Sequence, residues 1–277
     1  MPIDKGGSLP LKICVLKSGS SGNCTAIWTG ESAILIDCGG RISRESFCQM
    51  LRAIDLEPAR INAIVVTHGH GDHVNGDTVK IAEEYNIPLY IHKKTLLKGS
   101  DSKGKCPRCL IQHHNIRMFS VKEFRITPFR SVHEGGNAGQ PHGFCIEHGQ
   151  QSKARKIGYL TDTREVSRKM IRALSNSHCL VIEANHDLEM IENNPPRHVN
   201  WKQHLSNDAS ANAITEILKN SSDNALKCIF LAHLSRDNNT PQTALGKITR
   251  RIREAGFSKV NVLLTDQLKK SQIQELS

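Results

Sequence analysis

The chain has 277 residues, a net charge of +10 and a sequence pI near 9.2, and only 4% of its residues are aromatic. It holds no apolar run of the ~20 residues that a membrane span needs, and residues 1–10 lack the hydrophobic region of a signal peptide. Nine cysteines, an odd number, argue for reduced thiols rather than a disulfide framework, so we expect a cytoplasmic protein without membrane association.

The basic balance favours nucleic acid or a nucleotide as partner over a neutral small molecule, because neutralisation of phosphates by Lys and Arg drives such binding. No shift in composition marks a boundary, so residues 1–277 are expected to form a single domain.

The first part of the chain alternates between expected strands and helices. Strands are expected near residues 11, 25, 33, 61 and 88, and helices at Glu45–Ile54 and Gly76–Tyr85. The Gly/Ser/Asn segment Ser18–Asn23 is typical of a tight turn, which predicts that the first two strands form a hairpin.

The densest chemical signal follows the strand at Ile61–Val66, where Thr67–His73 reads THGHGDH. Three imidazoles and one carboxylate fall within six positions, and the glycines between them let the side chains converge. Imidazole and carboxylate suit Zn²⁺, Mn²⁺ or Fe²⁺. The alternative is a solvated His-rich loop, but such tracts lack a preceding strand and an interleaved Asp. Four ligands are too few for two ions, so the rest must come from downstream.

Three later strand ends offer side chains of the same kinds. Phe124–Phe129 leads to His133, an apolar run at Lys156–Thr161 ends on Asp162, and another at Cys228–Ala232 delivers His233. Any one of these three residues alone would commonly have a structural role, since polar residues at strand ends cap neighbouring loops. All three in this order favour a metal site. Further helices are expected at Glu165–Leu174, Asp208–Leu218 and Thr240–Ala255.

The HxHxDH pattern resembles the signature of the metallo-β-lactamase superfamily. The resemblance implies a fold of the α/β (α+β) class: an αββα sandwich of two mixed β-sheets, with helices on the outer faces and metals at one edge. It implies two divalent ions per chain, Zn²⁺ or Mn²⁺, about 3.5–4 Å apart, with a bridging hydroxide that performs hydrolysis. His68, His70 and His133 would hold the first ion, Asp72, His73 and His233 the second, and Asp162 would bridge them.

Further motifs narrow the resemblance to the YycJ/WalJ-like branch, which is related to tRNase Z. They occur in order between about Leu11 and Thr249, at Ser18–Asn23, Leu35–Gly39, Glu183–Asp187, His204–Asn207 and Leu231–Pro241. The branch is associated with 5′-exonuclease activity on double-stranded DNA and a role in mismatch repair. The resemblance therefore implies a metal-dependent phosphodiesterase whose favoured substrate is DNA.

The same resemblance implies a proton-transfer pair, in which Glu183 contacts His204 and His204 protonates the leaving oxygen. With Asp162, these are the expected catalytic residues. The structural alternatives are a buried carboxylate at Glu183 and, at His204, a neighbour of the helix that Ser206 or Asn207 caps. Arg236, Asn238 and Asn239 are candidate contacts to substrate phosphate. His186 and His142 could contact substrate or simply pack.

Two other features are expected to be structural. Asp37 ends its strand and is predicted to support the metal loop rather than to bind metal. Cys106-Pro107-Arg108-Cys109, followed by His113 and His114, could hold a structural Zn²⁺, although the spacing is not that of a known finger and a surface loop is the alternative. Six cysteines lie in or beside apolar runs and are expected to pack as small hydrophobes: Cys14, Cys24, Cys38, Cys145, Cys179 and Cys228.

Other functions stay open at this point. A phosphodiesterase acting on tRNA ends or cyclic nucleotides would use the same residues. A small-molecule (thio)ester hydrolase would use the same ions, but gives no reason for the Glu183–His204 pair or the basic charge. A nucleic-acid-binding module without metal is a third interpretation. The sequence neither identifies the metal nor sets the oligomeric state, a homodimer included.

Overall fold

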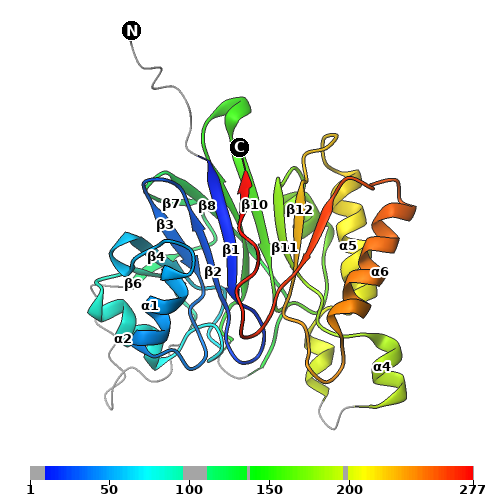
Figure 1. Cartoon of the computed structure of the whole chain (residues 1–277), viewed down its shortest axis with the longest axis horizontal. Helices are drawn as coiled ribbons and strands as arrows, with labels where there is room; N and C mark the ends of the chain where they lie inside the picture. Colours follow the sequence, from blue (N-terminus) through cyan, green and yellow to red (C-terminus); the bar gives the residue numbers. More distant parts are fainter. Residues whose placement is uncertain (1–9, 96–110, 136–137, 196–198, 277) are drawn as a thin grey trace.

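A computed structural model of the chain describes residues 10–95, 111–135, 138–195 and 199–276. Two mixed sheets of seven strands each stand face to face within this part of the chain (Figure 1). The first sheet has the order β14 (Gln274–Leu276), β1 (Leu11–Lys17), β2 (Cys24–Trp28), β3 (Ala33–Ile36), β4 (Ile61–Val65), β5 (Leu89–His92) and β6 (Ile111–His114). The second has the order β13 (Asn261–Leu264), β12 (Cys228–Ala232), β11 (Cys179–Glu183), β10 (Arg155–Leu160), β9 (His142–His148), β8 (Phe124–Arg130) and β7 (Phe119–Val121).

Helices cover the outer faces of both sheets. Figure 1 shows α1 (Arg44–Arg52) and α2 (Gly76–Glu84) on one side, and α5 (Asn207–Lys219) and α6 (Pro241–Glu254) on the other. Two shorter helices, α3 (Arg168–Leu174) and α4 (Leu188–Asn193), and three 3₁₀ turns at Pro58–Arg60, Gln151–Lys153 and Val199–Gln203 complete the described elements. The expected αββα sandwich is confirmed.

Three apolar layers hold this arrangement together. One lies between the first sheet and α1 with α2, one between the two sheets, and one between the second sheet and the helices α3, α5 and α6. Alternate residues of a strand face opposite sides of its sheet, so β3 sends Ile34 and Ile36 to the middle layer and Leu35 to the helix side. Strands buried on both faces explain the nearly continuous apolar runs in the sequence.

The helices begin where side chains can satisfy their first backbone N–H groups. Asn75 caps α2 and Ser206 caps α5, which settles the choice between Ser206 and Asn207. Thr240 caps α6, with Pro241 at its first position. The helix expected from Glu165 begins three residues later, because Ser167 supplies the cap and the chain before it is not helical. The other expected helices lie within two residues of their observed bounds.

The strand directions bring distant sequence motifs to one edge. β8 and β10 each run antiparallel to β9, and β10, β11 and β12 are parallel, so β8, β10 and β12 all end on the same side of their sheet. The residues that follow these strands include His133, Asp162 and His233. β3 and β4 are likewise parallel neighbours in the other sheet and lead into Asp37 and the THGHGDH loop.

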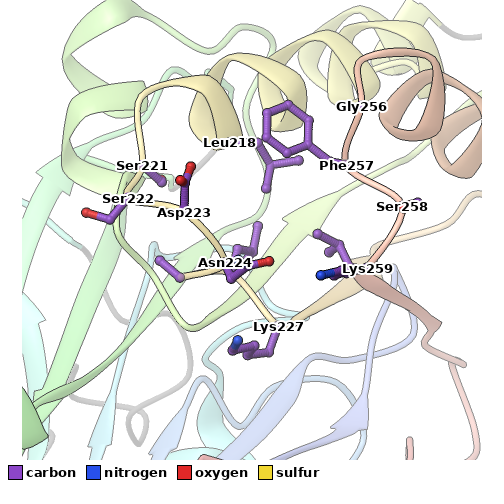
Figure 2. Close-up of a pocket in the computed structure, with 13 residues that line it drawn as sticks. Leu218, Ser221, Ser222, Asp223, Asn224, Lys227, Gly256, Phe257, Ser258 and Lys259 are labelled. Carbon is purple, nitrogen blue, oxygen red and sulfur yellow. The ribbon is translucent and has the colours of Figure 1, made fainter.

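The opposite end of the second sheet carries a surface pocket of about 340 Å³. It is lined by the loops before β12 and after α6, including Asn224, Lys227, Phe257 and Lys259 (Figure 2). Lys227 directly precedes β12 and His233 directly follows it, so this pocket is remote from the converging motifs. None of the helices in the described part of the chain combines the length and the apolar character that crossing a membrane requires.

Candidate metal centre

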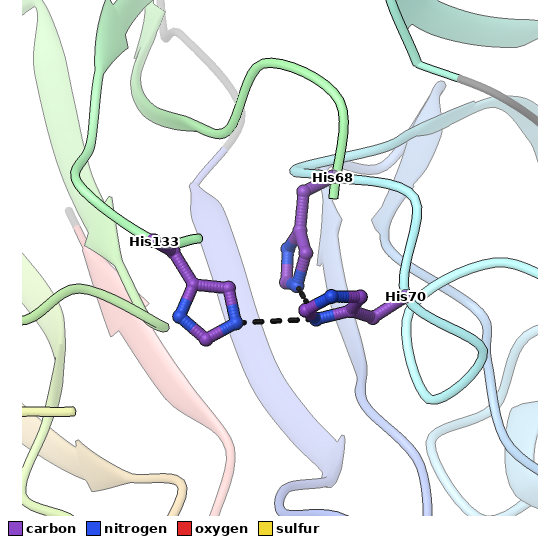
Figure 3. Close-up of side chains that lie close together, drawn as sticks. All are labelled: His68, His70 and His133. Carbon is purple, nitrogen blue, oxygen red and sulfur yellow. Dashed lines mark hydrogen bonds between the residues drawn. The ribbon is translucent and has the colours of Figure 1, made fainter. Parts of the chain in front are cut away.

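His68, His70 and His133 form the first group of potential ligands. Nε2 of His68 lies 3.1 Å from Nδ1 of His70, and Nε2 of His133 lies 3.1 Å from the same atom (Figure 3). Three nitrogens on one tetrahedral ion with bonds of 2.0–2.1 Å would be roughly 3.3 Å apart. The three imidazoles are therefore spaced as ligands of a single ion.

The outer nitrogens of these rings determine which atoms face the group. Nε2 of His70 donates to the carbonyl of Gly135 at 2.9 Å, and Nδ1 of His133 donates to the carbonyl of Gln203 at 3.2 Å. A carbonyl accepts only, so the proton of each neutral imidazole is on the outer nitrogen and the lone pair points inward. Burial lowers the pKa of His68 and of His133, which keeps both in the neutral form that binds metal.

A second group contains Asp72, His73 and His233, and Asp162 lies beside it. Nε2 of His73 is 3.5 Å from Oδ2 of Asp72 and 3.2 Å from Oδ2 of Asp162. Nε2 of His233 is 3.6 Å from Oδ2 of Asp72 and 3.4 Å from Oδ1 of Asp162. Asp162 also groups with His68, so its carboxylate lies between the two sets of ligands.

The donor set fits cations. Oδ2 of Asp162 and Nε2 of His233 are buried and make no hydrogen bond within the described residues, and a bound ion would satisfy both. Burial works to raise the pKa values of Asp72 and Asp162, but His73 and His233 lower both well below the ordinary value. Both carboxylates are therefore ionised, the state in which they bind metal.

Asp37 orients this centre from behind, as predicted. It is fully buried. Its Oδ2 accepts from Nδ1 of His73 at 2.7 Å and from the Thr67 hydroxyl at 2.8 Å, and its Oδ1 accepts from the Thr67 backbone at 2.8 Å. A carboxylate on Nδ1 directs the Nε2 lone pair of His73 toward the site. The Thr67 hydroxyl also lies 3.0 Å from Nδ1 of His68, so Asp37 and Thr67 together position two of the expected ligands.

Three residues of the site have a left-handed backbone. Asp37 has φ 59°, Asp162 has φ 53° and His233 has φ 56°. This conformation costs about 1–3 kcal/mol for a residue other than glycine and persists where surrounding contacts impose it. Each of the three follows a strand closely, so the reversal turns its side chain back across the sheet edge. The strained backbone of these three residues thus places their side chains at the candidate centre.

Glu183 and His204 are in contact. Oε1 of Glu183 accepts from Nδ1 of His204 at 2.6 Å, and Oε2 accepts from the backbone N–H groups of Thr163 and Leu205 at 3.0 and 3.2 Å. His204 also lies 3.7 Å from Asp162. Burial works to lower the pKa of His204, but Glu183 outweighs it and raises the value to about 9. The imidazole therefore carries a proton at neutral pH.

The candidate substrate contacts occupy different environments. Arg236 is exposed three residues after His233. Asn238 is buried, and its carbonyl accepts from the backbone of Asp187. His186 is buried, with its ring 5.3 Å from that of Trp201. The Asn239 amide donates to the carbonyls of Ala184 and Asn185, so this residue holds two loops together.

Sequence reasoning missed three polar residues that touch the expected ligands. Nδ2 of Asn23 lies 3.0 Å from Nε2 of His73 and 3.3 Å from Oδ2 of Asp72. Asn185 donates to the carbonyl of His233 at 2.9 Å. Ser18, at the other end of the Ser18–Asn23 turn, accepts from the backbone of His233 at 2.8 Å. The turn is thus more than hairpin scaffolding, and its polar composition was the signal for this second role.

The cysteines divide as follows. The six that were expected to pack in the core are buried. Cys106 and Cys109 lie outside the described residues.

Most of this chain is similar to known proteins. A family model described as "Beta-lactamase superfamily domain" matches residues 32–219. A Bacillus anthracis protein named exodeoxyribonuclease YycJ is 29% identical over 253 residues, covering 89% of this chain and 91% of the relative. A Streptococcus pneumoniae D39 protein named exodeoxyribonuclease WalJ is 32% identical over 241 residues, covering 84% and 85%. The metallo-β-lactamase fold protein YhfI from Bacillus subtilis superposes with a TM-score of 0.69 at 14% identity, covering 96% of this chain and 99% of that one.

The position of Asp37 generates the first prediction. We expect Asp37→Asn to weaken metal binding by about 10- to 100-fold, because the amide loses the charge that orients His73. Asn tolerates the left-handed backbone, so the change tests the carboxylate rather than the turn. The measurement is competition of the purified variant with a chelator of known affinity. Asp55→Asn is the matched control, since Asp55 is exposed and has φ 57°. Unchanged affinity in Asp37→Asn would show that Asp37 does not orient a ligand.

Proposed function

We propose that this chain is a divalent-metal-dependent phosphodiesterase that degrades DNA from a 5′ end. The chain belongs to the beta-lactamase superfamily and, within it, to the YycJ/WalJ-like branch. The observation that carries the reaction class is the position of the Glu183–His204 pair beside Asp162. A hydrolase that acts on a good leaving group has little use for a proton donor at this place, whereas the alkoxide that leaves a phosphodiester must be protonated.

The proposed cofactor is two Zn²⁺ or Mn²⁺ ions per chain. His68, His70 and His133 would hold one, Asp72, His73 and His233 the other, and Asp162 both; these groupings are supported by the distances among their ligand atoms. Bound ions would polarise the phosphodiester and lower the pKa of a water near it.

The protein groups supply positioning and proton transfer. Glu183 is fixed by two backbone donors and holds Nδ1 of His204, so the ring is oriented and its charged form is stabilised. His204 then releases the proton to the oxygen that leaves phosphorus, and the Glu183 carboxylate keeps its hydrogen bond to the neutral ring. Asn185 donates to the carbonyl of His233 and restrains that residue while this happens.

DNA is the favoured substrate for two reasons. The relatives named exodeoxyribonuclease are matched over most of their length. The chain also carries a net charge of +10, and exposed cations lie close in sequence to the expected ligands: Arg164 follows Asp162, and Arg236 follows His233. Cations at such positions can contact the phosphates next to the cut. Arg236 is the proposed contact, with Asn238 on the same loop and His186 on the loop after β11.

The second prediction concerns proton transfer. We expect His204→Ala and Glu183→Gln to lower the rate constant by about 100- to 10,000-fold, the usual contribution of general acid catalysis, while metal content stays unchanged. In Glu183→Gln the new amide can still accept from the backbone donors but no longer presents a negative charge to His204. The test compares the single-turnover rates and the metal contents of the variants with those of the wild type.

Two further variants serve as controls for this measurement. Asp162→Asn should lose both metal and turnover, because the shared carboxylate would be gone. His178→Ala, remote from the centre on the loop before β11, should change neither. Loss of metal from His204→Ala would mean that His204 is a ligand and that the proposed proton donor is wrong.

The third prediction concerns the substrate. Duplex DNA should be shortened from the 5′ end, and the logarithm of affinity should fall linearly with the logarithm of salt concentration by roughly 0.9 per contacted phosphate. Arg236→Ala should reduce that slope by about one, since one phosphate contact is lost. Lys259→Ala, which removes a cation beside the remote pocket, should leave it unchanged.

The assay compares 5′-labelled and 3′-labelled duplexes, precursor tRNA, cyclic nucleotides and thioesters over a salt series. Intact duplexes together with cleavage of tRNA or a cyclic nucleotide would retain the phosphodiesterase and overturn the DNA assignment. Cleavage of thioesters alone, with no salt dependence, would overturn both.

A further inference from the structure

The two segments that carry the proton-transfer pair lie side by side. Residues 183–187 begin at the end of β11, and residues 204–207 lead into α5. Glu183 and His204 make the first contact between the segments, at 2.6 Å. Two backbone hydrogen bonds follow: the N–H of Asn185 donates to the carbonyl of Leu205 at 2.9 Å, and the N–H of Asn207 donates to the carbonyl of His186 at 2.8 Å. The geometry of the pair therefore depends on how these two segments are held together.

The far ends of the two segments are joined by side chains. Nδ2 of Asn207 donates to Oδ2 of Asp187 at 3.3 Å and to Oδ1 of Asn239 at 3.0 Å. The amide of Asn239 donates in return to Oδ1 of Asn207 at 2.9 Å. Asp187 and Asn207 are no more than 1% exposed. Hydrogen bonds within such a buried network are strong, and the loss of one member leaves the others without partners.

Lys247 reaches this buried network from α6. Its Nζ lies 2.8 Å from Oδ2 of Asp187, and only 18% of its side chain is exposed. Two other acids, Glu189 and Asp208, lie farther from Nζ, at 3.6 and 3.7 Å, and more than half of each side chain is exposed. Burial works to raise the pKa of Asp187, but hydrogen bonds, chiefly that of Lys247, lower it below the ordinary value. Lys247 is therefore the cation that lets Asp187 stay ionised while buried.

We propose that Lys247 is a positioning residue for proton transfer by His204. Through Asp187 and Asn207 it holds the 204–207 segment against the 183–187 segment, so that His204 stays on the Glu183 carboxylate. The inference rests on the proposed function, in which His204 protonates the leaving oxygen. A hydrogen bond of 2.6 Å tolerates little movement, and a misplacement of about 1 Å can lower a rate by about 100-fold.

The test compares two leaving groups on the metal-loaded protein. The alkoxide that leaves DNA needs a proton, whereas the p-nitrophenolate that leaves bis(p-nitrophenyl) phosphate is stable without one. We expect Lys247→Met to lower the single-turnover rate on saturating duplex DNA by about 100-fold. Hydrolysis of the p-nitrophenyl ester and the metal content should stay nearly unchanged. Lys247→Arg keeps the charge and should restore DNA cleavage. In His204→Ala, which already lacks the proton donor, Lys247→Met should lower DNA cleavage no further.

A second variant keeps the test independent of how well Lys247→Met folds. Asp187→Asn leaves no buried charge without a partner, and the new amide oxygen can still accept from the backbone N–H of Met190, as Asp187 does. It should show the same loss on DNA and the same indifference on the ester. Arg250→Met is the matched control, because Arg250 is exposed about one turn farther along α6 and pairs with Glu254. It should change neither rate.

The outcomes separate this inference from the function on which it rests. Equal losses on DNA and on the ester in Lys247→Met would mean that Lys247 supports the fold or the metal centre as a whole, and would overturn the proposal. Unchanged DNA cleavage in Lys247→Met or Asp187→Asn, or a further loss in the His204→Ala background, would overturn it as well. A wild type that hydrolyses neither substrate, or a His204→Ala variant that loses both activities equally, would overturn the proposed function itself.

Discussion

The candidate centre depends on one geometric constraint, the meeting of strand ends from two sheets at a single edge. β3 and β4 deliver Asp37 and the THGHGDH loop from one sheet, and β8, β10 and β12 deliver His133, Asp162 and His233 from the other. The middle apolar layer fixes how far apart these edges stand. Close packing allows little adjustment, so the layer sets the spacing of ligands that no local segment could bring together.

Buried charge is tolerated at this edge because acids and imidazoles are interleaved. Asp72 and Asp162 remain ionised despite burial, since His73 and His233 lie within 3.2 to 3.6 Å of them. An isolated buried carboxylate would be protonated instead. The residues proposed to bind cations are thus also the residues that allow one another to be buried, which ties the stability of this edge to its proposed chemistry.

The expected ligands are themselves held in place by contacts with several other residues. The Ser18–Asn23 turn contacts Nε2 of His73 and the backbone of His233. Thr67 and Asp37 contact the outer nitrogens of His68 and His73. Rings restrained at their outer nitrogens lose little freedom when their inner nitrogens bind an ion. The strained backbone of Asp162 and His233 is consistent with the same requirement, because the loops around them must impose a conformation that those residues disfavour.

By itself, the sequence determined the strands and helices that carry the motifs, since apolar runs and periodicity are local, and it placed the candidate ligands at strand ends by the same reasoning. Helix starts were less certain: the helix expected from Glu165 begins at Arg168, because the side chain of Ser167 accepts from the backbone of Met170 and caps it there. The resemblance supplied the partition of ligands and the Glu183–His204 pair.

Only the tertiary structure decided which polar side chains meet across long separations. The contact of Asn23 with His73 joins residues 50 positions apart, and that of Ser18 with His233 joins residues 215 apart. No pattern within a segment records such contacts, because they arise from how sheets pack and not from how each strand forms.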